Sequence, residues 1–99
     1  MYRQGDVLLR KVSKIKGGKV YSEVKDKILA RGEVTGHNHR IEGAKARVLR
    51  SASGQLLVEL EEPAKLVHEE HGTIELEAGN YEVIRQREYD PIKERLVSD

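Results

Sequence analysis

The sequence predicts an all-β fold: one domain over residues 1–99, built as a small antiparallel barrel or sandwich with a short C-terminal helix. Two observations predict it. Val, Leu and Ile supply 26 of the 99 residues, while Phe and Trp are absent, and branched aliphatic residues favour strands. Nine glycines divide the chain into short β-prone segments, which is typical of strands joined by turns. Six or seven such strands suit the single core that a chain of this length can close.

The first half of the chain contains two of these segments. Asp6–Val12, DVLLRKV, is rich in β-forming residues and is expected as an aliphatic edge strand. The basic segment Ser13–Lys19 follows, and its two adjacent glycines predict a loop. A further strand is expected in Lys27–Val34, which leads into the first of two histidine pairs.

The second half predicts two hairpins and a helix. In Lys45–Glu62, two apolar segments flank the dipeptide SG, a hairpin-turn signal. In Thr73–Tyr89, two more strands flank Ala78–Asn80, which predicts a second hairpin. The segment Asp90–Leu96 is expected to be helical, because Asp and Pro begin it and apolar residues recur four apart.

The distribution of charge along the chain bears on the partners that the protein could bind. Residues 1–50 hold 13 basic and 5 acidic side chains, whereas residues 51–99 hold 5 and 12. Strands from the two halves either interleave and neutralise each other, or present a positive face to an anionic partner or to another subunit. We expect a homo-oligomer.

No apolar run is long enough for a membrane span or a signal peptide, so a cytoplasmic location without membrane contact is expected.

The four histidines form two tight pairs, GHNHR and HEEHG, and no other histidine is present. On a strand, His37 and His39 project to the same face. His68 and His71 lie three residues apart, which suits a tight turn or one turn of helix. We predict that both pairs meet in one concave site. Since the chain has no cysteine, three or four imidazoles with an optional carboxylate would hold a divalent transition metal, Zn, Fe, Ni, Co or Mn.

The leading hypothesis for function is metal-dependent hydrolysis of a phosphodiester, with RNA or a nucleotide as the anionic substrate. The metal would activate a water molecule, and Glu69 or Glu70 would act as base or orient the ligands. Cations are needed for the phosphate, and Arg40, Arg85 and Arg87 lie near the histidines or on the last predicted strand.

Two other hypotheses remain open. Two of the histidines could act as general acid and base in a metal-free, ribonuclease-like enzyme, because imidazole titrates near neutral pH. Alternatively, the protein binds nucleic acid without catalysis, through the basic residues Lys11, Lys14, Lys16 and Lys19. This third hypothesis lacks the usual stacking platform, since Phe and Trp are absent.

The segment GEVTGHNHRIEG resembles the first cupin motif, in which HxH and a downstream Glu bind a metal inside a β-barrel. It departs from that motif in two spacings: four residues separate Gly32 from His37, and Glu42 follows His39 after two. The resemblance implies an analogy of chemistry only. Together, RQGDVLL, GEVTGHNHR, HEEHG and RQREY resemble small uncharacterised bacterial and phage proteins, which implies no particular activity.

Overall fold

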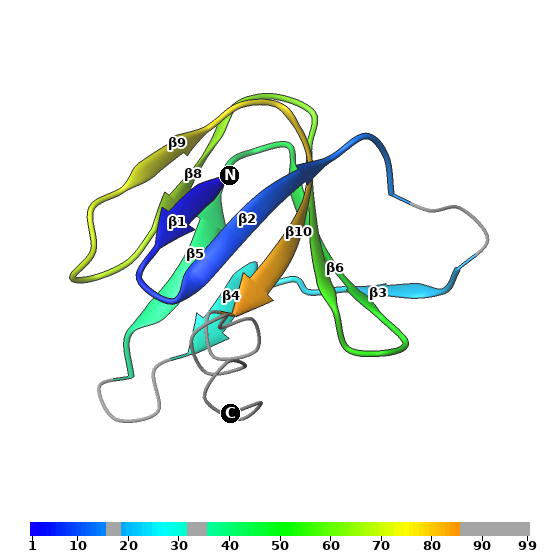
Figure 1. The fold of residues 1–99 in the computed structure, drawn as a ribbon, viewed down its shortest axis with the longest axis horizontal. Coiled ribbons are helices and arrows are strands. Elements are labelled where there is room, and N and C mark those ends of the chain that lie inside the picture. The colour runs from blue at the N-terminus through cyan, green and yellow to red at the C-terminus, as the bar shows by residue number, and fades with distance from the viewer. Residues whose placement is uncertain (16–18, 32–35, 86–99) are drawn as a thin grey trace, which may run out of the picture.

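The computed structural model describes residues 1–15, 19–31 and 36–85, and these form ten strands in two antiparallel sheets (Figure 1). The six-stranded sheet has the order β1 (Tyr2–Gln4), β2 (Val7–Val12), β10 (Gly79–Arg85), β7 (Leu56–Leu60), β6 (Ala46–Ser51) and β3 (Tyr21–Glu23). The four-stranded sheet has the order β4 (Ile28–Arg31), β5 (Asn38–Glu42), β8 (Ala64–Val67) and β9 (Ile74–Leu76).

The core lies between the two sheets and is almost entirely aliphatic. Alternate residues of each strand point to the same face, and those facing inward are buried, including Leu9 and Val58 of the larger sheet and Leu66 of the smaller. Tyr81 is the largest fully buried side chain. Its hydroxyl donates to the carbonyl of Glu77 at 2.6 Å, and burial raises its pKa to about 12.

The all-β class is confirmed, but the barrel alternative is wrong for the described residues. They form two separate sheets with no closed barrel, and ten strands replace the expected six or seven. The expected helix, Asp90–Leu96, lies outside the described residues, as does residue range 16–18 of the basic loop. Within the described part of the chain, no helix is long and apolar enough to cross a membrane.

One predicted hairpin is confirmed and the other is wrong. β6 and β7 pair antiparallel around Gly54, whose φ of 92° suits glycine. β9 and β10 do not pair with each other, because Leu76 pairs with Ala64 in the smaller sheet while Gly79 pairs with Leu60 in the larger. The segment between them crosses from one sheet to the other, so both strands cover the same core.

The strand expected at an edge, β2, instead lies inside the larger sheet. It pairs with β1 on one side and with β10 on the other. The backbone of β2 is therefore paired on both sides within the chain, and the expected homo-oligomer stays a prediction.

Several chain segments that are far apart in sequence meet at one end of the two sheets. The β1–β2 turn, the start of β5 and the end of β10 lie toward the lower side of Figure 1. Register agrees with the picture, since Arg85 at the end of β10 is opposite Val7 at the start of β2. This end of the molecule carries the histidines.

Candidate metal centre

His39 lies on β5 with its side chain toward the core, and only 6% of the residue is exposed. The alternation of the strand places it on the same face as the buried Ile41. A buried imidazole needs partners for its polar atoms. The Nδ1 atom of His39 lies 2.9 Å from Oε1 of Gln4, on the inner face of the other sheet.

Gln4 determines which nitrogen of His39 carries the proton. Its Nε2 group donates to the carbonyl oxygens of Leu66 and Gly72, each at 2.9 Å. That assignment leaves Oε1 as an acceptor, so Nδ1 of His39 must be the donor. Neutral His39 therefore keeps a lone pair on Nε2. A second hydrogen bond that orients a histidine in this way is typical of metal ligands.

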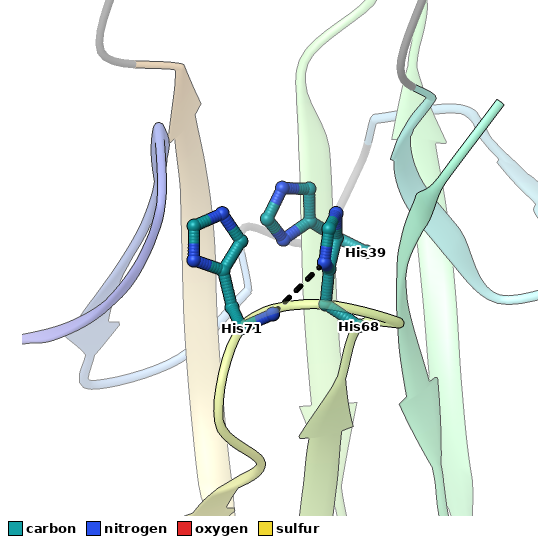
Figure 2. A group of neighbouring side chains, drawn as sticks. All are labelled: His39, His68 and His71. Carbon is teal, nitrogen blue, oxygen red and sulfur yellow. Dashed lines mark hydrogen bonds between the residues drawn. The ribbon is translucent and has the colours of Figure 1, made fainter. Parts of the chain in front are cut away.

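His68 and His71 come from the loop between β8 and β9, and their rings lie beside that of His39 (Figure 2). The Nδ1 atom of His68 accepts the backbone amides of Glu70 and His71, at 3.0 Å and 3.2 Å. These contacts form the tight turn that the spacing of three predicted. They also place the proton of neutral His68 on Nε2, opposite to the arrangement in His39.

The three rings are close enough to share one ion. One nitrogen from each of His39, His68 and His71 lies within 4.8 Å of the others. Nitrogens bound to one tetrahedral zinc ion would be about 3.3 Å apart, given bonds of about 2.0 Å. Binding would therefore draw the rings together. His71 is exposed to solvent. His68, in order to bind a metal through Nε2, would have to move its proton to Nδ1 and release the two amides.

A carboxylate and a guanidinium complete the immediate surroundings of His39. The Oδ1 atom of Asp6 lies 3.5 Å from Nε2 of His39. Oδ2 of the same carboxylate accepts from Nε and Nη2 of Arg85, at 3.2 Å and 2.8 Å. Burial alone would raise the pKa of Asp6, but the hydrogen bond and charge of Arg85, together with the Asp6 backbone and His39, hold that pKa below its ordinary value. Asp6 thus stays ionised near the imidazoles.

His37 lies beside the three-histidine group rather than in it. It precedes β5 by one residue, and its ring centroid is 5.6 Å from that of His68. Its Nδ1 atom lies 3.0 Å from Oε1 of Glu70. The two predicted pairs do converge, but among the described residues only three histidines offer mutually close ligand atoms.

The glutamates of HEEH hold the loop against β5. Oε2 of Glu69 accepts the backbone amide of Asn38 at 2.9 Å, and this hydrogen bond lowers the pKa of Glu69 below its ordinary value. Glu70 contacts His37, as above. In these positions the glutamates join the first histidine segment to the second.

The predicted phosphate-binding arginines are only partly brought to the site. Arg85 is adjacent, but its charge is paired with Asp6. Arg40 pairs with Glu42 at 3.0 Å and alternates with His39 along β5, on the other face of the strand. Arg87 lies outside the described residues, as does Lys16 of the basic set.

Sequence reasoning missed the β1–β2 turn, Gln4-Gly5-Asp6, which supplies three features of the site. Gln4 orients His39, Asp6 faces it, and a Cβ placed on Gly5 would lie 2.7 Å from Nε2 of His71. One signal was available in the sequence. Gln4 lies three residues before the buried Val7, at the inward-facing end of a strand. A polar residue at such a core position needs hydrogen-bond partners.

We expect Gly5→Ala to displace the ring of His71. The new methyl group would occupy the space of that ring, and the φ of 58° is costly for alanine, by about 1 kcal/mol. Gly36→Ala is the matched control, because its φ is 75° but no atom of the described residues lies within 4 Å of the position that its methyl group would take. Two-dimensional NMR should show shifted His71 imidazole resonances in Gly5→Ala only. Equal shifts in both variants would contradict the steric argument.

The metal-free protein should lose stability as the pH falls from about 6.5 to about 4. Burial lowers the pKa of His39 to about 4, with the neighbouring His68 adding to the effect. The unfolded chain binds the proton near pH 6.5, so it holds more protons than the folded chain in this window, and stability decreases as the pH is lowered. The loss should be about 2–3 kcal/mol at pH 4.5 relative to pH 7.

Urea unfolding at both pH values measures this loss. His39→Asn is the comparison, because the asparagine amide can still donate to Gln4 but does not titrate. A pH dependence that is the same in both proteins would exclude His39 as its source.

Fold and site together define a small two-sheet domain with a three-histidine cluster at one end. Residues 3–86 match the family described as Domain of unknown function (DUF8820), and the chain belongs to that family. The match includes every residue of the cluster and its surroundings. No curated protein and no solved structure gives a significant match.

Proposed function

We propose that the protein binds one divalent transition-metal ion through His39, His68 and His71 and acts as a metal-dependent phosphodiesterase. The convergence of three imidazole nitrogens within 4.8 Å carries the proposal. Imidazole suits Zn, Fe, Ni, Co and related metals better than Ca or Mg. Three protein ligands leave a position for water, which is the arrangement of catalytic rather than structural zinc sites.

The surroundings support a catalytic role for such an ion. A bound metal would supply a water of lowered pKa at neutral pH. Asp6 is the carboxylate closest to His39 Nε2, at 3.5 Å, and it is ionised. It is therefore placed to accept a proton from that water or to orient it, the role expected from Glu69 or Glu70. Burial keeps His39 neutral, and Gln4 holds it in the tautomer that can bind a metal.

Metal analysis of protein purified without a histidine tag tests the proposal. We expect one equivalent of a transition metal per chain, and hydrolysis of a generic phosphodiester, bis(p-nitrophenyl) phosphate, that is lost on chelation and restored by the metal. A chain that takes up no Zn²⁺, Co²⁺, Ni²⁺, Mn²⁺ or Fe²⁺ in titration would refute the metal site. Tight binding without hydrolysis would refute only the proposed reaction.

One observation favours the metal-free alternative. His39 presents a lone pair on Nε2, while His68 presents a proton on Nε2, and their ring centroids are 4.3 Å apart. His39 is thus in the form that a general base needs, whereas His68 could act as general acid only after it binds a second proton on Nδ1 and releases the two amides. Cleavage of RNA that persists at full rate after exhaustive chelation would establish this alternative and exclude the metal-dependent mechanism.

A further inference from the structure

A cavity of about 540 Å³ lies at the end of the larger sheet where β6 and β10 end, and one residue of its lining, Arg85, also contacts the surroundings of the histidine group. Its apolar wall includes Leu29 of β4, Leu56 of β7 and Val83 of β10. Its polar residues include Arg50 of β6 and Arg85 of β10, and none of the described residues that line it is acidic. The volume is in the range of pockets that hold small molecules, and the lining suits a ligand with an apolar part and an anionic part.

Arg50 stands at a position where the strand pattern would continue the core. Val48 is opposite Val58, and both are fully buried. Arg50 follows on the same face of β6, opposite Leu56. An aliphatic residue there would extend the core; an arginine instead brings a permanent charge to the mouth of the cavity.

The charge of Arg50 is not neutralised within the described residues. Five other arginines pair with carboxylates: Arg10, Arg31, Arg40, Arg47 and Arg85. Arg50 has no acidic partner in residues 1–15, 19–31 and 36–85. A guanidinium in a cavity without acidic lining attracts an anion, and its planar donors match a phosphate in bidentate fashion.

The cavity and the histidines are adjacent through one ion pair. Arg85 lines the cavity and binds Asp6, and Asp6 in turn lies 3.5 Å from Nε2 of His39. An anionic group held by Arg50 would therefore be positioned on one side of Arg85, with the three imidazoles on the other.

We propose that this cavity binds the phosphate-bearing part of a nucleotide-sized substrate, with Arg50 as its principal cation. The proposal rests on the proposed function in assigning the ligand as a substrate, but the binding itself needs no metal. In this proposal Arg50 takes the place of Arg40, which lies on the other face of β5, as the expected phosphate contact. A cavity of this size favours a small organic phosphate over a polymer.

Titration calorimetry of the chelated, metal-free protein tests the binding, with adenosine 5′-monophosphate as probe and adenosine as comparison. We expect the monophosphate to bind at least tenfold more tightly than adenosine, and Arg50→Gln to remove that preference without changing thermal stability. Arg47→Gln is the matched control, because Arg47 lies on the same strand but pairs with Glu59 on the outer face. It should bind the monophosphate as the unmodified protein does.

Each outcome decides the proposal. Absence of monophosphate binding, an unchanged affinity in Arg50→Gln, or an equal loss in Arg47→Gln would overturn it. The metal titration is independent of this result. A chain that binds the monophosphate through Arg50 but takes up no metal would keep the pocket and refute the metal site, and the reverse result would refute the pocket alone.

Discussion

His39→Ala, His68→Ala and His71→Ala should each weaken the binding of Zn²⁺ by about 100-fold or more, whereas His37→Ala should leave the affinity within about threefold. Zinc sites with four ligands bind with about 10–16 kcal/mol in total. One ligand therefore accounts for about 3–4 kcal/mol, or two to three orders of magnitude in affinity. His37 is expected to differ because it is not part of the group with mutually close nitrogens.

Competition with a chromophoric zinc chelator measures all four affinities under one condition. His39 is buried, so His39→Ala could unfold the chain instead of removing a ligand; His39→Asn retains a donor for Gln4 and serves as a second variant. Circular dichroism then verifies that each variant is folded. A large loss in His37→Ala would show that the site uses all four histidines. Unchanged affinity in His68→Ala would show that His68 is not a ligand and serves only the turn that it forms with Glu70 and His71.

Part of the convergence of the histidines could be predicted, because the direction of each side chain depends on local periodicity, whereas the meeting of the two pairs depends on the pairing of β5 with β8. Alternation along a strand fixes the side of His39, and a spacing of three fixes the turn at His68. With no cysteine in the chain, these were the strongest candidate ligands. What periodicity could not supply was the distinction between His37 and His39, which depends on where β5 begins and on the contact of His37 with Glu70.

The contribution of the β1–β2 turn could not be predicted in the same way, because it depends on the order of strands in the two sheets. Gln4 and His39 are 35 residues apart, and they meet only because β1 of one sheet faces β5 of the other. The same limit applies to Ala78–Asn80. Its turn-forming residues suit a hairpin and a crossover equally well, and the pairing partners of Leu76 and Gly79 decide between the two.

The arginines show why the partners of charged residues could not be predicted from the sequence. The place of Arg85 on a strand predicts a phosphate contact, but its observed partner, Asp6, lies 79 residues away. In the sequence, the apolar neighbours of Arg50 predict only a hairpin strand. Its place in the lining of a cavity depends on Leu29 and Val83, which come from other strands.

Gln4 variants should separate the folding role of this residue from its effect on the metal site. In Gln4→Met, a side chain of similar length replaces all three hydrogen bonds with apolar contacts. Nδ1 of His39 would then lack its partner, and the carbonyl groups of Leu66 and Gly72 would each lose one donor, at about 1–3 kcal/mol for each group that is left unsatisfied while buried. We expect a loss of about 3 kcal/mol or more in stability, together with a 10- to 100-fold loss of Zn²⁺ affinity.

Gln4→Glu supplies the comparison, because it removes the two donations to backbone carbonyls but preserves the acceptor for His39. A carboxylate in place of an amide also increases the basicity of the imidazole it accepts from, as in the carboxylate–histidine pairs of metal sites. We therefore expect Gln4→Glu to lose stability in the metal-free state, as Gln4→Met does, but to bind Zn²⁺ at least as tightly as the unmodified protein. Urea unfolding and chelator competition on the same samples give the two quantities. If affinity instead falls in proportion to stability in both variants, Gln4 acts by holding the two sheets together and has no separate influence on His39.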